Sequence, residues 1–233
     1  MPSRCPVTFI WFDLGYTLLY KQREEPYRKV LAEEGLEVSL EALEREYHIV
    51  DKLFMREYPN VFGRDPDTFM PWFLGHLNYR LGVRTDLAGM WVRLKREQNG
   101  GAASWVPFAN TQEALTELCR RGMRLGVISN WDGSARPILE RYGLAGSFEQ
   151  IVISSEVGCE KPDPAIFELA MQSAGVVPQE CLYVGDNFYV DAVGARRAGM
   201  DCLIVNRFGR LGVEEITEPV IIRDVSEVAG YLG

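Results

Sequence analysis

The sequence predicts an α/β fold in which a parallel β-sheet is covered by helices on both faces and is interrupted, after its first strand, by an all-helical segment. Two observations support this. Short apolar runs alternate with helical patterns over most of the chain, and residues 18–106, which follow the first run, show helical patterns without a clear strand. Alternation of strands and helices is typical of a parallel sheet.

The expected strands are short runs of apolar and β-branched residues, most of which stop at a polar residue or a glycine. They are Val7–Phe12, Arg124–Ser129, Gln150–Ser154, Cys181–Val184, Cys202–Val205 and Val220–Ile222. Between them, apolar residues at helical spacing predict helices, most of which are followed by a glycine that can end them. These helices are Thr111–Arg121, Ala135–Tyr142, Ala165–Ala174 and Val190–Ala198.

The segment after the first strand predicts a separate helical domain. Its expected helices are Pro26–Glu34, Leu40–Tyr58, Asp67–Leu81 and Asp86–Glu97, and Gln98–Pro107 is expected to be the linker that returns to the sheet. We therefore expect two domains, one formed by residues 1–17 and 107–233 and the other by residues 18–106.

Composition narrows the class of protein. The chain has 233 residues, 47% of them hydrophobic, and a net charge of −8, which argues against a nucleic-acid partner or an anionic membrane. The five cysteines are odd in number and form no CxxC pair, which is typical of a reducing compartment. Neither a membrane span nor a signal peptide is evident. We expect a cytoplasmic monomer or homodimer without a membrane partner.

Polar residues gather where the expected strands end. Asp13 follows the first strand, Ser129 ends the second, and Asp186 follows the fourth with Asp191 close behind; Lys161 stands in a loop before a helix. Ligands of open α/β sheets bind beyond the carboxyl ends of the strands. These side chains are therefore expected to meet at one edge of the sheet.

The chemistry of such a cluster is restricted. Carboxylates that lie close together repel one another and favour a cation between them. Hard oxygen ligands without a convergent histidine or cysteine select Mg²⁺ rather than zinc. A lysine and a hydroxyl beside Mg²⁺ suit a phosphorylated substrate, and one carboxylate can act as the nucleophile. Gly15 lets the backbone approach closely, and the amides after Asp13 can hold the transferring oxygens.

Four segments, DLGYT, VISNWDG, GCEKPDP and YVGDNFYVD, resemble the four motifs of the haloacid dehalogenase superfamily in their order and spacing. The resemblance extends over essentially the whole chain and is to the branch that carries a helical cap after the first motif. It implies a Rossmann-like core with a helical cap, and the activity of a Mg²⁺-dependent phosphatase acting on a small phosphorylated molecule.

The resemblance also implies a role for each motif residue. Asp13 is the nucleophile, and Ser129, Asn130, Lys161 and Gly15 bind the substrate. Asp13, Asp186 and the backbone carbonyl of Gly15 hold Mg²⁺, Asp191 supports the site, and Thr17 orients the first loop.

One position departs from the family. Its phosphatases usually read DxDxT, whereas Gly15 here replaces the second aspartate, which serves as general acid and base. The nucleophile and metal ligands remain, but the proton shuttle is lost. General acid–base catalysis contributes about 10²–10⁴-fold to a rate.

Three other functions remain open beside a phosphatase. Dehalogenases of the family also lack the second aspartate, but the carboxylate of Asp186 would repel a haloacid substrate. A phosphonate hydrolase would keep the metal and would need a cap lysine. Lys21, Lys29, Lys52 and Lys95 lie in the helical segment, but none of them stands in a recognisable motif. The fourth possibility is a binding or regulatory protein with weak catalysis on the same scaffold.

Overall fold

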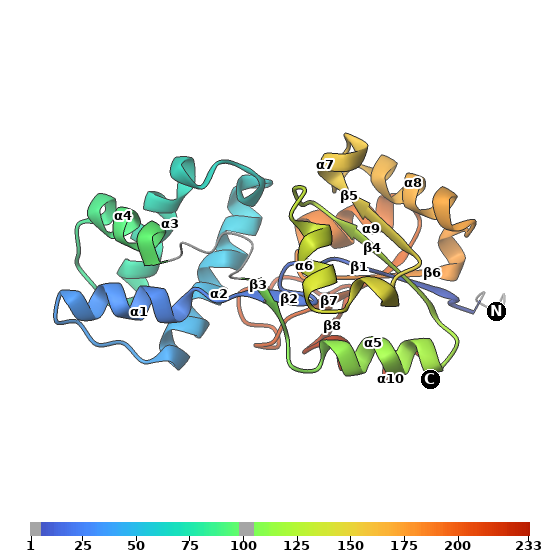
Figure 1. The fold of residues 1–233 in the computed structure, drawn as a ribbon, viewed down its shortest axis with the longest axis horizontal. Coiled ribbons are helices and arrows are strands. Elements are labelled where there is room, and N and C mark those ends of the chain that lie inside the picture. The colour runs from blue at the N-terminus through green and yellow to red at the C-terminus, as the bar shows by residue number, and fades with distance from the viewer. Residues whose placement is uncertain (1–5, 98–104) are drawn as a thin grey trace. The chain divides into compact units, whose positions relative to one another are not determined.

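The computed structural model describes residues 6–97 and 105–233, which form two compact units (Figure 1). The first contains the described residues of Met1–Tyr20, Trp105–Arg210 and Glu214–Gly233. The second contains those of Lys21–Ser104 and Leu211–Val213. The chain thus leaves the first unit after Tyr20 and again after Arg210, and the first unit continues from Trp105 and from Glu214. Of the expected linker Gln98–Pro107, residues 98–104 lie outside the described residues.

The first unit is built on a parallel sheet of six strands. In spatial order these are β5 (Gln150–Ile153), β4 (Arg124–Ser129), β1 (Phe9–Phe12), β6 (Cys181–Gly185), β7 (Asp201–Val205) and β8 (Val220–Ile222). All five neighbouring pairs are parallel. Each expected strand is therefore confirmed, and β1 lies in the interior of the sheet, with β4 and β6 on either side.

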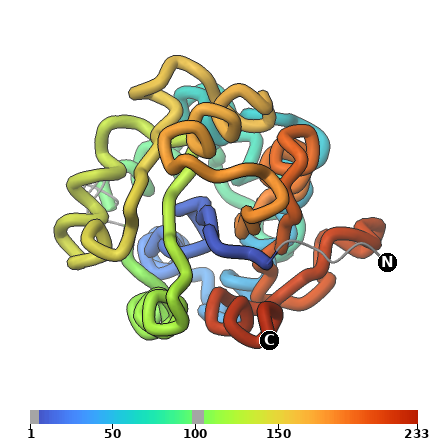
Figure 2. Tube along the Cα trace, turned by 90° about the vertical axis from the view of Figure 1, so that its right-hand side faces the viewer, coloured from blue at the N-terminus to red at the C-terminus, as the bar shows by residue number. Residues whose placement is uncertain are grey.

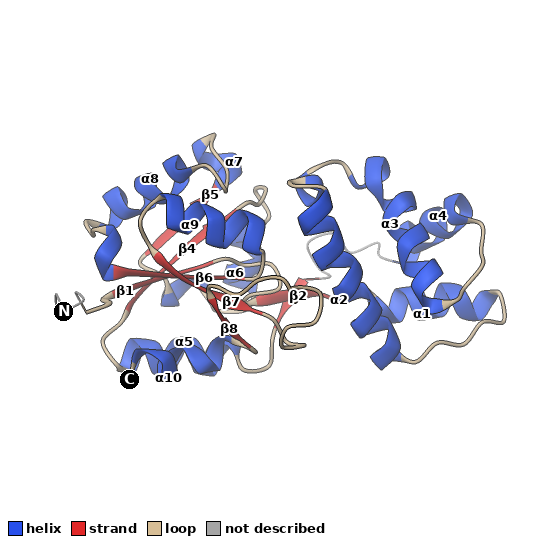
Figure 3. Cartoon of the chain, turned by 180° about the vertical axis from the view of Figure 1, so that it is seen from behind, coloured by secondary structure: helices blue, strands red, loops and turns tan. Residues whose placement is uncertain are grey.

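Helices cover both faces of this sheet (Figure 3). They are α5 (Thr111–Arg120), α6 (Ala135–Arg141), α7 (Ser154–Val157), α8 (Pro164–Ala174), a π-helical turn over Phe188–Ala192, α9 (Val193–Arg197) and α10 (Val228–Leu232). Helices α5 and α10 lie side by side against one face, and α8 and α9 lie against the other (Figures 2 and 3). The predicted α/β fold is confirmed.

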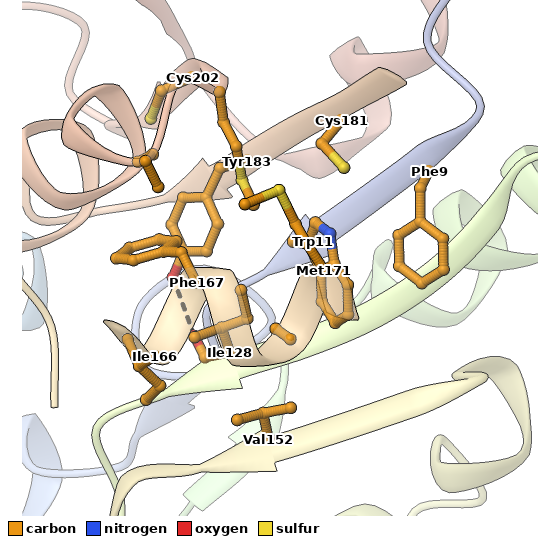
Figure 4. Packing of buried hydrophobic residues seen from close by; sticks show 14 of the residues in the cluster. Phe9, Trp11, Ile128, Val152, Ile166, Phe167, Met171, Cys181, Tyr183 and Cys202 are labelled. Atoms are coloured by element: carbon orange, nitrogen blue, oxygen red, sulfur yellow. Dashed lines mark hydrogen bonds between the residues drawn. The ribbon is translucent and has the colours of Figure 1, made fainter. Parts of the chain in front are cut away.

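Apolar side chains between the sheet and α8 form the core of this unit (Figure 4). Phe9 and Trp11 of β1 stack with their ring centroids 4.3 Å apart, and Phe167 of α8 packs edge to face against Tyr183 of β6. The backbone of α8 is fixed at its start because the Asp163 side chain accepts the amide hydrogen of Ala165. This core packs against β1, β4 and β6, which pair in parallel register, and this register places the ends of the three strands side by side.

The second unit consists of helices around its own aromatic core. They are α1 (Glu24–Glu33), α2 (Leu40–Glu57), α3 (Pro66–Leu81) and α4 (Leu87–Glu97). Their apolar faces meet around Tyr47, Phe54 and Phe73, which are almost fully buried. The structure has no helix, within the ranges that it describes, with the length and apolar character of a membrane span.

The expectation that residues 18–106 contain no strand is wrong at both ends of the segment. Strands β2 (Leu19–Lys21) and β3 (Trp105–Pro107) pair in a separate two-stranded sheet. Each has only three residues, too few for an alternating pattern to stand out in the sequence. Their pairing is supported by stacking of Tyr20 on Phe108, with ring centroids 4.9 Å apart.

Candidate active site

The carboxyl end of β1 places Asp13 between two other strand ends. Phe12, the last residue of β1, is in register with both β4 and β6, and the amide of Asp13 donates to the carbonyl of Val184. Ser129 ends β4, and Asp186 directly follows β6. The topology therefore brings these three predicted site residues to one edge of the sheet.

The carboxylate of Asp13 is buried and is held through one of its oxygens. Oδ1 accepts hydrogen bonds from Ser129 Oγ and from Lys161 Nζ, each at 2.7 Å. No donor among the described residues bonds to Oδ2. Burial raises the pKa of Asp13, while the ammonium of Lys161 opposes this shift. The arrangement fixes the carboxylate and leaves one oxygen for an electrophile or a metal ion.

Lys161 is the charged centre of the cluster, with only 2% of its surface exposed. Its ammonium has three hydrogens and three acceptors: Oδ1 of Asp13 at 2.7 Å, Oδ1 of Asp191 at 2.6 Å and the hydroxyl of Tyr183 at 2.8 Å. Burial alone would lower the pKa of Lys161, but the two carboxylates raise it above its usual value. Lys161 is therefore charged, and a phosphoryl oxygen would have to replace one of the three acceptors.

Asp191 connects this lysine to the loop that follows β6. It stands on the π-helical turn, where its Oδ2 accepts the amide hydrogens of Asp186 at 3.0 Å and of Asn187 at 2.9 Å. A Cβ at Gly185 would lie 2.3 Å from the same oxygen, so only glycine lets the carboxylate approach the backbone. Asp191 therefore fixes both Lys161 and the position of Asp186.

Three buried carboxylates form a cluster that suits a hard divalent cation. Asp13, Asp186 and Asp191 can each place one oxygen within 4.8 Å of the other two. Both oxygens of Asp191 already accept hydrogen bonds, so Asp13 and Asp186 are the better carboxylate ligands. A set of oxygen ligands without histidine or cysteine matches the preference of such cations. The residues present therefore fit the expected metal.

Two other predicted residues lie in the same region. The side chain of Asn130 makes two hydrogen bonds with the backbone of Lys161: Oδ1 accepts from the amide at 2.8 Å, and Nδ2 donates to the carbonyl at 2.9 Å. Asn130 thus holds the loop that carries Lys161. Thr17 is buried, and its hydroxyl has no hydrogen-bond partner among the described residues.

Tyr183, the first residue of the YVGDNFYVD segment, is a member of the site to which the motif resemblance assigned no role. Its hydroxyl accepts from Lys161 Nζ, lies 3.2 Å from Asp191 Oδ1 and donates to the carbonyl of Ile128 at 2.9 Å (Figure 4). It thereby ties Lys161 to the end of β4, next to Ser129. A tyrosine within a fully buried strand signals that its hydroxyl needs a polar partner, and this signal was present in the sequence.

Replacing Tyr183 by phenylalanine is expected to lower the free energy of unfolding by about 1–3 kcal/mol, because one hydrogen of Lys161 and the Ile128 carbonyl lose their partner. Urea denaturation measures this. Tyr231→Phe, at a tyrosine that is 41% exposed on α10, is the matched control and should change little. Equal stability of the two variants would contradict the assigned hydrogen bonds.

Comparison with known proteins identifies the family. The family model described as haloacid dehalogenase-like hydrolase matches residues 40–205. The chain belongs to the haloacid dehalogenase-like hydrolases. It is thus a hydrolase, as the resemblance of its motifs implied. Among curated members of the family, a glyceraldehyde 3-phosphate phosphatase of Methanothermobacter thermautotrophicus is 30% identical over 84% of this chain and 74% of its own length.

Other members of the haloacid dehalogenase-like family are also similar to this chain in sequence or in structure. Human haloacid dehalogenase-like hydrolase domain-containing protein 3 is 29% identical over 88% of this chain and 84% of its own length. A phosphoserine phosphatase of Thermus thermophilus is 37% identical over 52% of this chain and 49% of its own. The crystal structure of a phosphatase from Thermococcus onnurineus covers 97% of this chain and 98% of its own, with 23% identity and a TM-score of 0.59, and shows the shared fold.

Proposed function

We propose that this hydrolase is a Mg²⁺-dependent phosphatase that acts on a small phosphate ester through a phosphorylated Asp13. The observation that carries the proposal is the state of the Asp13 carboxylate, with Oδ1 held by Ser129 and Lys161 and Oδ2 without a donor among the described residues. Relatives named for the phosphatase activity support a phosphorylated substrate.

The chemistry assigns a part to each side chain. An oxygen of Asp13 attacks phosphorus, and the bond to the leaving oxygen breaks with its electron pair on that oxygen. The charged Lys161 and the hydroxyl of Ser129 stabilise negative charge on the phosphoryl oxygens, while Asp191 and Tyr183 hold Lys161 in place. When bound, Mg²⁺ would neutralise phosphoryl charge between Asp13 and Asp186.

Gly15 limits which esters react quickly. It provides no proton for the departing oxygen, and it provides no base for the water that later attacks the phosphorylated Asp13. Esters whose leaving group departs as a weak base are therefore turned over best. Because the attack of water on phosphorylated Asp13 lacks its base, this second step is slow, and the phosphorylated enzyme accumulates.

A screen of the purified protein tests this function. Aryl, acyl and sugar phosphates, a phosphonate and a 2-haloacid are each incubated with Mg²⁺ or with EDTA. We expect hydrolysis of the aryl, acyl and sugar phosphates but not of the phosphonate or the haloacid, and only with Mg²⁺. Release of halide from the haloacid in EDTA would favour a dehalogenase instead, although a carboxylate substrate would meet the charge of Asp186. Release of phosphate from the phosphonate alone would favour the C–P hydrolase.

Metal binding is testable separately from activity. Because Asp186 is one of two carboxylate ligands, Asp186→Asn is expected to weaken Mg²⁺ binding at least about tenfold. Titration calorimetry measures the affinity. Glu113→Gln, which removes an exposed carboxylate on α5, is the matched control and should bind Mg²⁺ as the wild type does. Equal affinity in Asp186→Asn and in the control would contradict the proposed ligand.

A further inference from the structure

Aromatic rings surround Gly15 at the position where a side chain would project. A Cβ built on Gly15 would lie 3.4 Å from Cζ3 of Trp131 and 3.6 Å from Cη2 of Trp105. The two indole rings pack edge to face with centroids 4.7 Å apart, and the ring of Tyr16 lies 5.6 Å from that of Trp105. Tyr16, Trp105 and Trp131 form an aromatic cluster, and its member nearest to Asp13 in sequence, Tyr16, lies three residues after that aspartate.

The fold fixes the position of this aromatic cluster. The amide of Trp131 donates to Ser154 Oγ at 3.1 Å, and its indole N–H donates to Ser134 Oγ at 3.0 Å. Tyr16 has a φ of +53°, a left-handed conformation that is unfavourable for a residue with a side chain. Such strain persists where the surrounding structure imposes it, and it is frequent at functional sites.

The same rings remain partly accessible. Tyr16, Trp105 and Trp131 are each neither buried nor fully exposed, whereas Asp13 is buried. The indole N–H of Trp131 is already used by Ser134, so this ring offers its apolar surface and no proton. What lies beside Gly15 is therefore aromatic surface at the point where the family's phosphatases place a carboxylate.

We propose that the aromatic cluster is the leaving-group subsite, and that it selects phosphate esters with an aromatic leaving group. The inference rests on the proposed phosphatase function. In that function a carboxylate at residue 15 would serve the leaving oxygen, so the rings that contact this position stand beside the leaving group. An aryl leaving group stacks on them and departs as an aryl oxide, which takes its proton from water.

The reaction balances without an acid from the protein. Asp13 forms its bond to phosphorus while the bond from phosphorus to the aryl oxygen breaks, and the electron pair leaves on that oxygen. Water then attacks the phosphorylated Asp13, which releases inorganic phosphate, and its proton passes to solvent. The aromatic cluster thus supplies binding where the glycine has removed proton transfer.

Two substrates whose leaving groups both depart without taking up a proton can separate the effect of aromatic stacking from the effect of leaving-group basicity. The KM of the full chain with Mg²⁺ is measured for 4-nitrophenyl phosphate and for acetyl phosphate. Trp131→Leu and Trp105→Leu are expected to raise the KM for the aryl ester about 2- to 10-fold and to leave that for acetyl phosphate unchanged. Trp131→Phe should keep most of the affinity. Trp72→Leu, at a half-exposed tryptophan of α3, is the control and should change neither KM.

A binding measurement on the wild type needs no variant. With Mg²⁺ present, calorimetry should show tighter binding of phenylphosphonate than of methylphosphonate. Equal affinities for the two phosphonates would overturn the proposed subsite, and so would an equal rise of the KM for the aryl ester and for acetyl phosphate in the tryptophan variants. Neither result would contradict the proposed phosphatase function. Absence of any phosphate-ester hydrolysis by the wild type, or full hydrolysis by Asp13→Asn, would overturn the proposed function and the subsite with it.

Discussion

Asp13→Asn is expected to lower kcat/KM for phosphate-ester hydrolysis by at least about 10⁴-fold, because the amide that replaces the carboxylate is a far weaker nucleophile. The fold should persist. The amide oxygen of asparagine can still accept from Ser129 Oγ and Lys161 Nζ, and the second carboxylate beside Lys161, that of Asp191, is untouched. Steady-state kinetics measure the loss.

Stability provides the control for this variant. Burial raises the pKa of Asp13, which means that the folded protein disfavours the charged carboxylate relative to the unfolded chain. In EDTA, Asp13→Asn should therefore unfold at the same temperature as the wild type or at a higher one. Glu113→Gln should change neither activity nor melting temperature. Retained turnover in Asp13→Asn would remove Asp13 from the mechanism.

Lys161→Met is expected to cost both activity and stability. It leaves the buried carboxylates of Asp13 and Asp191 without their shared cation, and breaking a buried ion pair in this way costs about 3–5 kcal/mol. Without the ammonium the folded-state pKa of Asp13 rises further above its unfolded value. The loss in free energy of unfolding is therefore largest at pH values above the folded-state pKa of Asp13. It shrinks as the pH falls and the carboxyl group of Asp13 is protonated.

Urea denaturation in EDTA at neutral and at mildly acidic pH measures this dependence. Lys29→Met, at a lysine of α1 whose side chain is 60% exposed, is the matched control. Its free energy of unfolding should stay within about 0.5 kcal/mol of the wild type at both pH values. A deficit in Lys161→Met that is small, or that grows towards acidic pH, would contradict the charge arrangement of the cluster.

The sequence predicted the inner strands of the sheet well because every residue of β1 and of β6 is buried. Their sequences, FIWF and CLYVG, are continuous apolar runs that end directly before Asp13 and Asp186. The motif residues that end these strands then converge because parallel strands share one carboxyl edge. The three-residue strands β2 and β3 escaped prediction because their pairing depends on residues far apart in the chain.

Only those residues of the site that belong to the four motifs could be predicted from the sequence. Asp13, Lys161 and Asp191 follow from motif order, but the three acceptors that saturate Lys161 depend on the packing of separate strands and loops. The loss of the acid at Gly15 was visible in the sequence. That Trp105 and Trp131 stand beside it was not, because no local pattern connects these positions.

The central claim, phosphoryl transfer through Asp13, is tested most directly by trapping the intermediate. The wild type with Mg²⁺ is mixed with an aryl phosphate labelled with ³²P and quenched in acid within the first turnover. We expect label bound to the protein in a peptide that contains Asp13, and no label in Asp13→Asn. Turnover of the ester without bound label, or label on a different residue, would contradict the claim.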